Sequence, residues 1–131
     1  MKMQLPSITF DGIKHREFDT IIDVRSPSEH KLDHIPGSKN LPALSDEERA
    51  EVGTTYKQES RFKARKIGAA KISKNVAAHI EGFLFQKDRQ WRPLIYCWRG
   101  GQRSFAFATI LAQIGWRPTL LSGGYKNYRR E

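Results

Sequence analysis

The sequence predicts an α/β protein built on a mainly parallel sheet. Short apolar runs at residues 20–24, 93–96 and 116–121 indicate buried strands. Segments in which apolar residues recur near the helical period separate these runs, and strands that alternate with helices usually pair in parallel. At 131 residues the chain is long enough to bury one core, so we expect a single domain over residues 1–131.

The first third of the chain is predicted to contain two strands, a short helix and a turn. Residues 7–10 are expected to form a short opening strand, and the β-branched residues of 20–24 form a stronger one. Ser26 or Ser28 can cap a short helix that follows. Two prolines and a glycine within residues 33–42 then predict a turn and a short edge strand.

The middle of the chain is predicted to be helical in two pieces. Ser45 and Glu48 have the spacing of a capping box, which begins a helix that runs to about Val52. Gly53 and the two threonines after it are expected to interrupt this helix. Apolar residues recur at near-helical spacing between residues 56 and 86, which predicts a second helical stretch before the next strand.

One loop holds most of the residues that could carry chemistry. It follows the strand at 93–96 and contains the only cysteine, Cys97, with two glycines and two arginines. Residues 105–114 predict a buried helix directly after it, and Gly115 is positioned to end that helix. Backbone N–H groups and the helix dipole stabilise an anion at such a strand-to-helix turn. We therefore interpret Cys97 as an ionised nucleophile rather than as a small buried apolar side chain.

Two reactions suit a sulfur nucleophile among N–H donors. Sulfur-atom transfer would leave a persulfide on Cys97, and phosphate-ester hydrolysis would phosphorylate it transiently. Arg103 could bind an oxyanion bidentately or fix the loop through a salt bridge, for example to Asp23. Arg99 is expected to face the substrate, and Trp98 either stacks on a base or packs at the rim. The predicted anion-binding loop consists of Trp98, Arg99, Gly100, Gly101, Gln102, Arg103 and Ser104.

The charge of the chain indicates a polyanionic partner. Lys and Arg number 23 against 14 Asp and Glu, which gives a formal charge of +9. This bias favours nucleic acid over an acidic membrane surface. Basic residues also crowd one helical region, where they suit either a solvated helix face or a surface that contacts phosphates. They are Lys57, Arg61, Lys63, Arg65, Lys66, Lys71 and Lys74.

Several other classes of protein are not expected. A single cysteine cannot form an internal disulfide, and a working thiol favours the reducing cytoplasm. The first residues lack the apolar core of a secretory signal, and no run is long enough to span a membrane. His15, His30, His34 and His79 lack metal-ligand spacing, so no metal is predicted. The absence of a G-x-x-x-x-G-K-[ST] element argues against nucleoside triphosphate binding within this chain.

Several of these motifs together resemble the rhodanese family. Asp23 and Arg25 belong to an Asp-Val-Arg strand end, and residues 34–42 resemble the His-Ile-Pro-Gly-Ala-x-Asn turn of that family. Cys97 occupies the rhodanese nucleophile position, and residues 121–124 resemble its closing Gly-Gly turn. The resemblance implies a five-stranded, mainly parallel sheet with helices on both faces. It also implies a supporting role for Asp23 and Arg25.

Two features of the sequence point to different members of this fold. Arg103 follows Cys97 by six residues, whereas in common sulfurtransferases the arginine follows the cysteine by five. The longer spacing resembles that of the rhodanese-fold phosphatases with a Cys-x5-Arg signature. Residues 97–104, 52–68 and 123–130, however, resemble bacterial tRNA 2-selenouridine synthases. Three separate blocks are more specific than one loop length, so we favour the second resemblance.

The resemblance implies an enzyme that converts wobble 2-thiouridine of tRNA to 2-selenouridine through a geranylated intermediate. Geranyl diphosphate and selenophosphate would be its co-substrates, with Cys97 as nucleophile or selenium carrier and no cofactor in this domain. The implied partners are tRNA and a C-terminal P-loop domain of the same enzyme. That domain is not in this chain, and a helix that begins near residue 125 would lead to it.

Two alternatives remain open at this point. A Cys-x5-Arg phosphatase would need a carboxylic general acid near the loop, for which Asp23, Asp33 or another carboxylate could serve. A non-catalytic module would instead dock tRNA or the rest of the enzyme, and its cysteine would be dispensable.

Overall fold

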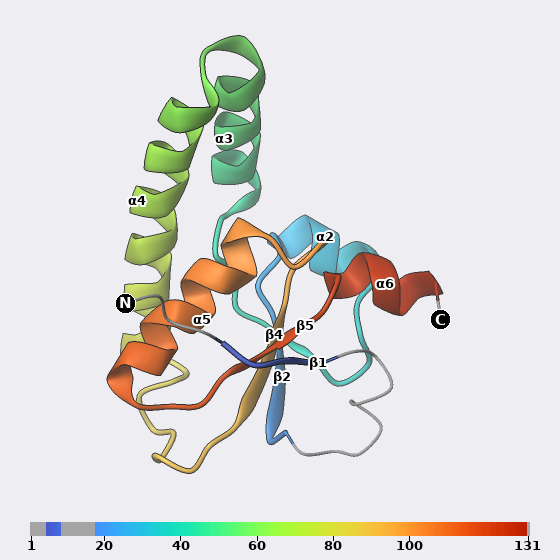
Figure 1. The fold of residues 1–131 in the computed structure, drawn as a ribbon, viewed down its shortest axis with the longest axis vertical. Coiled ribbons are helices and arrows are strands. Elements are labelled where there is room, and N and C mark those ends of the chain that lie inside the picture. The colour runs from blue at the N-terminus through green and yellow to red at the C-terminus, as the bar shows by residue number, and fades with distance from the viewer. Residues whose placement is uncertain (1–4, 9–17, 131) are drawn as a thin grey trace.

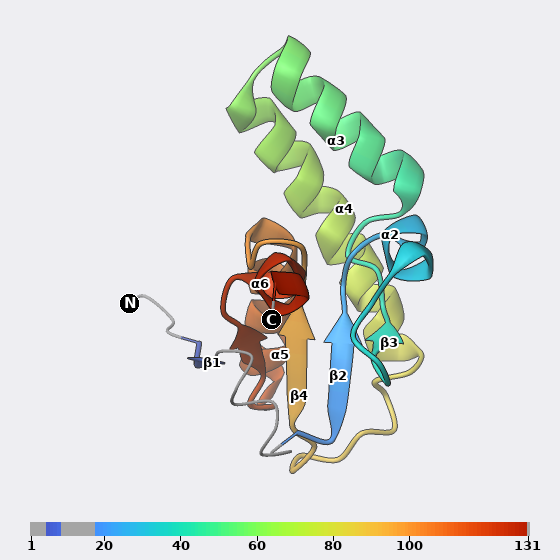
Figure 2. The same ribbon diagram turned by 90° about the vertical axis from the view of Figure 1, so that its right-hand side faces the viewer.

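The central sheet has five parallel strands in the order β1-β5-β4-β2-β3 (Figures 1 and 2). The structure is a computed structural model, and it describes residues 5–8 and 18–130. The predicted α/β class and parallel sheet are confirmed. Thr9 and Phe10, the second half of the predicted opening strand, lie outside the described residues. The strands are β1 (Ser7–Ile8), β2 (Thr20–Asp23), β3 (Lys39–Asn40), β4 (Pro93–Tyr96) and β5 (Thr119–Leu121).

Helices cover both faces of the sheet, as the resemblance implied. They are α2 (Pro27–Leu32), α3 (Asp46–Gln58), α4 (Arg61–Glu81), α5 (Gln102–Ile114) and α6 (Gly124–Arg130). None of these helices is both long enough and apolar enough to cross a membrane.

Side chains of β4 alternate between two hydrophobic cores because successive residues of a strand point to opposite faces. Ile95 packs with Ile72 of α4 and Phe107 of α5 on one face. Leu94 and Tyr96 pack on the other face in a smaller cluster that includes Tyr125 of α6. The two clusters place β4 at the centre of the molecule, so the loop that follows it starts from a rigid support.

The two long helices end at different positions from those predicted. α3 continues through Gly53 to Gln58, and the hydroxyl of the buried Thr55 donates a hydrogen bond to the carbonyl oxygen of Glu51 at 2.9 Å. The break falls instead at Ser60, whose Oγ accepts a hydrogen bond from the N–H of Lys63 at 2.9 Å and caps α4. The predicted interruption at residues 53–55 was therefore wrong, and so was a helix to residue 86, since α4 ends at Glu81.

α3 and α4 form a helical hairpin that projects beyond the carboxyl ends of the strands (Figures 1 and 2). Ile72 and Val76, in the second half of α4, are buried in the core and anchor the hairpin. Ala64 and Gly68, nearer the tip, are buried although they are small. Small residues allow two helices to approach closely, and a β-carbon on Gly68 would lie 3.8 Å from Val52 of α3. α3 also lies beside the loop that follows β4, since both line one cavity.

Candidate active site

Cys97 lies directly after β4, where the loop into α5 begins, and only 2% of it is exposed. The backbone N–H of Gly101 donates to Sγ at an N–S distance of 3.2 Å. The hydroxyl of Ser104 lies 3.1 Å from Sγ and 3.3 Å from the carbonyl oxygen of Gly101. The sulfur thus accepts one backbone hydrogen bond at the first turn of α5, and it lies beside a hydroxyl that can donate either to Sγ or to the carbonyl of Gly101.

A glycine turn at the start of α6 holds this loop in place. Gly124 has a φ of +64°, and a β-carbon there would lie 2.7 Å from the nitrogen of Gly100 and from the carbonyl oxygen of Trp98. The N–H of Tyr125 donates to the carbonyl of Cys97 at 2.8 Å. The turn therefore needs glycine both for its left-handed backbone and for close contact with the loop.

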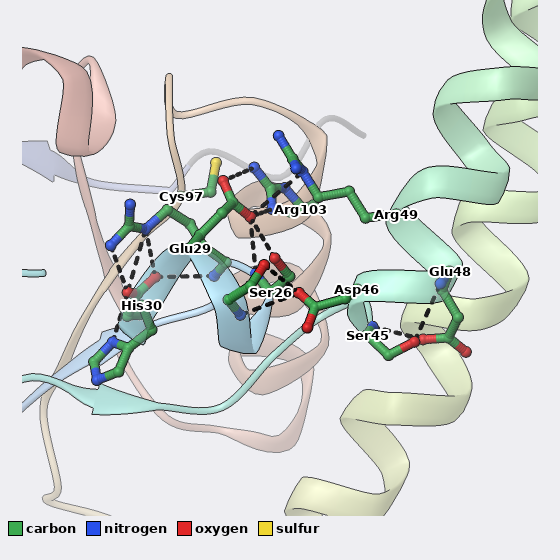
Figure 3. Close-up of polar contacts among 12 residues, drawn as sticks. Ser26, Glu29, His30, Ser45, Asp46, Glu48, Arg49, Cys97 and Arg103 are labelled. Atoms are coloured by element: carbon green, nitrogen blue, oxygen red, sulfur yellow. Dashed lines mark hydrogen bonds and ion pairs between the residues drawn. The ribbon is translucent and has the colours of Figure 1, made fainter. Parts of the chain in front are cut away.

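Arg103 fixes the loop to α2. Its Nη1 donates to Glu29 Oε1 at 2.7 Å, and Arg49 of α3 approaches the same oxygen with Nε at 3.4 Å (Figure 3). Glu29 also accepts the N–H of Ser26 at 2.9 Å. Partial burial alone would raise the pKa of Glu29, but the bonds from Arg103 and Ser26 and the charge of Arg49 lower it overall. The partner of Arg103 is thus Glu29, and the suggested salt bridge to Asp23 was wrong.

Asp23 and Arg25 lie behind the loop and do not contact the sulfur. Arg25 donates through Nε and Nη2 to the fully buried carboxylate of Asp23, at 3.0 and 2.9 Å. His30 Nδ1 lies 2.8 Å from the same carboxylate. The guanidinium of Arg25 packs over the ring of Tyr125 at 4.3 Å. Since Tyr125 bonds the carbonyl of Cys97, this cluster supports the loop through α6.

Cys97 borders an open cavity of about 580 Å³ between the loop and α3. On the loop side the cavity is lined by Trp98, Arg99, Gly101, Gln102 and Arg103. The two other predicted loop residues do not line it: Ser104 contacts the sulfur, and Gly100 packs on the turn at Gly124. Arg99 is exposed, and Trp98 is half-buried beside Tyr125, with ring centroids 6.1 Å apart.

The opposite wall of the cavity was missed by the sequence analysis. It is formed by one face of α3, which presents Asp46, Arg49, Tyr56 and Lys57. Their spacing places them on one side of a helix, and this was the available signal. The sequence contains no indication of which helix face turns toward Cys97, because that depends on how the hairpin packs.

Among the residues that the structure describes, no carboxylate at the site is arranged as a general acid. Asp23 is bound to Arg25 and His30, and Asp33 does not line the cavity. Asp46 does line it, but its Oδ1 accepts hydrogen bonds from the hydroxyl and the N–H of Ser28, at 2.7 and 3.1 Å. These bonds lower the pKa of Asp46, so it is ionised at neutral pH and holds no proton to donate.

The histidines have structural partners within the described part of the chain. His34 Nδ1 lies 2.6 Å from the carbonyl of His30, and His79 Nε2 lies 2.8 Å from that of Pro42. His15 is outside the described residues. No group of three or more His, Cys, Asp or Glu side chains that could hold a metal occurs in residues 5–8 and 18–130.

In this fold the cysteine follows the central strand of a five-stranded parallel sheet, and a glycine-containing loop joins it to the next helix. This arrangement is typical of one class of protein. The family model of the rhodanese-like domain matches residues 10–131, and the chain belongs to that family. A rhodanese-related protein from Thermoplasma volcanium shares the fold, with a TM-score of 0.60 and 19% identity over 95% of this chain and 91% of that one.

More similar proteins narrow the class. The chain is 41% identical to a tRNA 2-selenouridine synthase of Nitrosomonas europaea, over 84% of this chain and 29% of the relative. The synthase of Bdellovibrio bacteriovorus is 35% identical over 97% of this chain and 34% of its own length. The chain therefore spans about a third of the length of these curated relatives. The resemblance drawn from the sequence motifs is confirmed.

A further solved structure is similar in both sequence and fold. It is the N-terminal domain of a protein from Clostridium difficile 630 that is described as an ATP/GTP binding protein. The TM-score is 0.76 and the identity is 32%, over 95% of this chain and 96% of that one.

Proposed function

We propose that this chain is the rhodanese-like domain of a tRNA 2-selenouridine synthase and that Cys97 is its nucleophile. The observation that carries the proposal is the position of Cys97. Its sulfur accepts a hydrogen bond from the N–H of Gly101, contacts the hydroxyl of Ser104 and borders a cavity that is open to solvent. A thiol with only a structural role needs neither the donors nor the cavity. The similarity to proteins named tRNA 2-selenouridine synthase supports the reaction that we propose.

In this proposal the complete enzyme converts wobble 2-thiouridine of tRNA to 2-selenouridine through a geranylated intermediate. Geranyl diphosphate and selenophosphate are the co-substrates, and Cys97 acts as nucleophile or selenium carrier in the selenation step. Gly101 and Ser104 stabilise the anionic sulfur. The exposed Arg99 and Lys57 at the cavity give anionic donors a favourable potential.

The remaining part of the enzyme is proposed to contain a P-loop domain that follows α6. Two observations support this. The curated relatives are about three times as long as this chain, and the similar Clostridium difficile domain comes from a protein described as binding ATP or GTP.

We also propose that the protein works in the cytoplasm, because a reducing compartment would keep Cys97 in its working thiol form.

The phosphatase alternative has less support. The six-residue separation of Cys97 and Arg103 favours it, but Arg103 is bound to Glu29 rather than free to clamp a phosphate. Asp46, the carboxylate on the cavity wall, holds no proton at neutral pH. A phosphatase would lack both its oxyanion clamp and its acid in this arrangement.

A chimeric enzyme tests the proposal. This chain would replace the rhodanese-like third of the Nitrosomonas europaea synthase, and 2-selenouridine in digested cellular tRNA would be measured by mass spectrometry. We expect the chimera to form 2-selenouridine, the Cys97→Ser chimera to form none, and an Arg117→Ala control to match the parent. Selenation by the Cys97→Ser chimera would exclude Cys97 as nucleophile and favour the non-catalytic docking module.

A further inference from the structure

The helical hairpin carries much of the positive charge of the chain. Between Val52 and Lys74 there are seven Lys and Arg residues and one acidic residue, Glu59. Within the described part of the chain, two of the seven pair with a carboxylate: Lys63 with Glu59 at 2.5 Å and Lys71 with Glu51 at 3.3 Å. The other cations leave an uncompensated positive surface, which attracts a polyanion.

Two aromatic side chains lie exposed among these cations. Tyr56 is 49% exposed and Phe62 is 68% exposed, although phenylalanine is usually buried. The guanidinium of Arg61 lies 5.5 Å from the ring centroid of Tyr56, and Nζ of Lys66 lies 5.1 Å from that of Phe62. Alternating cations and exposed rings are typical of surfaces that bind single-stranded nucleic acid, where phosphates meet the cations and bases stack on the rings.

This surface is continuous with the cavity at Cys97. Arg49, Tyr56 and Lys57 line that cavity from α3, and Arg61 contacts Tyr56 from the start of α4. We call these four residues the hairpin stripe. The stripe extends from the cavity to Arg61 at the start of α4. Figure 2 shows that the hairpin projects beyond the carboxyl end of β4, the strand that Cys97 directly follows.

We propose that the hairpin stripe binds a single-stranded RNA loop, with phosphates at Lys57 and Arg61 and a base on Tyr56. This rests on the proposed function, which makes RNA the substrate. A base within a duplex could not reach a sulfur that is 2% exposed, so the reacting nucleotide must leave its stack. Stacking of its neighbour on Tyr56, at the cavity wall, would direct that nucleotide toward Cys97.

The test measures the affinity of this chain for a fluorescent RNA stem-loop with 2-thiouridine in its loop. We expect the Lys57→Glu/Arg61→Glu variant to weaken binding by about tenfold or more and to reduce the salt slope by about 1.4, the loss of two single-strand phosphate contacts. Tyr56→Ala should weaken binding by about fivefold or more through lost stacking and leave the slope unchanged.

The matched control reverses the same amount of charge elsewhere. Arg89 and Arg117 are exposed at the amino ends of β4 and β5, at the opposite end of the sheet from Cys97. We expect Arg89→Glu/Arg117→Glu to change affinity by less than about twofold. Equal losses in the two double variants, or unchanged affinity in Lys57→Glu/Arg61→Glu, would overturn the proposal. The second result would leave the hairpin as a surface for the rest of the enzyme.

RNA binding by the hairpin stripe and the nucleophilic role of Cys97 can be disproved separately. Cys97→Ser is expected to bind the RNA as the parent does, because its sulfur does not belong to the stripe. A parent that gains one sulfur atom on Cys97 after incubation with thiosulfate, measured by intact mass, but that binds no RNA would overturn the stripe alone. RNA binding that depends on the stripe, with no modification of Cys97, would overturn the proposed function alone.

Discussion

At the scale of single residues, we expect the reactivity of Cys97 to depend on the hydroxyl of Ser104. That hydroxyl is fully buried and lies 3.1 Å from Sγ. Removal of a hydrogen bond to a charged group costs about 1.5 kcal/mol, which would lower the thiolate fraction by roughly tenfold. Because a more basic thiolate is also more nucleophilic, Ser104→Ala should slow alkylation of Cys97 by iodoacetamide at neutral pH by roughly threefold. Ser122→Ala, at an exposed position, is the control and should alkylate at the parental rate. An unchanged rate in Ser104→Ala would show that this hydroxyl does not stabilise the thiolate.

Glu29 gives the chain a pH-dependent part of its stability. Its pKa is lower in the folded protein than its ordinary value of 4.5. A carboxyl with a lowered pKa stabilises the fold above its unfolded pKa, and this contribution is lost as the pH falls through the folded pKa. Glu29→Gln also leaves Arg103 without its charged partner, so we expect a loss of about 1–3 kcal/mol at neutral pH.

Urea unfolding from neutral pH to about pH 3 measures this contribution. The difference in free energy of unfolding between the parent and Glu29→Gln should shrink as the pH falls below 4.5, the ordinary pKa of the carboxyl. A difference that stays constant down to the acid end would mean that the charge of Glu29 does not stabilise the loop. Glu59→Gln, which removes an exposed ion pair with Lys63, should lose less than about 1 kcal/mol.

At the scale of elements, two glycines should respond in opposite directions to the same substitution. Gly124→Ala must displace the backbone of Cys97, Trp98 and Gly100, and alanine is strained at a φ of +64°. We expect a loss of about 2 kcal/mol or more in the free energy of unfolding. Gly53→Ala meets open space in the middle of α3 and should gain about 0.5–1 kcal/mol. Thermal and urea unfolding of both variants check the signs, and a neutral Gly124→Ala would contradict the close fit of α6 to the loop.

The helices also show which parts of an element the sequence can predict. The capping box of α3 was predicted correctly because Ser45 and Glu48 bond each other within one turn, at 2.8 and 3.1 Å. The interruption at Gly53 was wrong because the cost of one glycine is small when a helix packs along its length. α3 packs against α4, and Thr55 is buried there. These contacts come from residues that are distant in sequence.

At the scale of the whole molecule, the features that could be predicted are those that local sequence patterns determine. The strands around β4, the helix after Cys97 and the loop between them follow from apolar runs and glycines in sequence. The pairing of Arg103 with Glu29 joins residues 74 positions apart, and no local signal selects Glu29 over Asp23. The α3 wall of the cavity likewise arises only when the hairpin packs beside the loop.

The intact mass of this chain after incubation with thiosulfate tests the central claim most directly. The Cys97 thiolate would attack the outer sulfur, a sulfur–sulfur bond would form, and sulfite would leave with the electron pair of the broken bond. We predict that the parent gains one sulfur atom, which a reducing agent removes, and that Cys97→Ser gains none. A parent whose mass stays unchanged, or a Cys97→Ser variant that gains sulfur equally, would contradict the assignment of Cys97 as the chalcogen-accepting nucleophile.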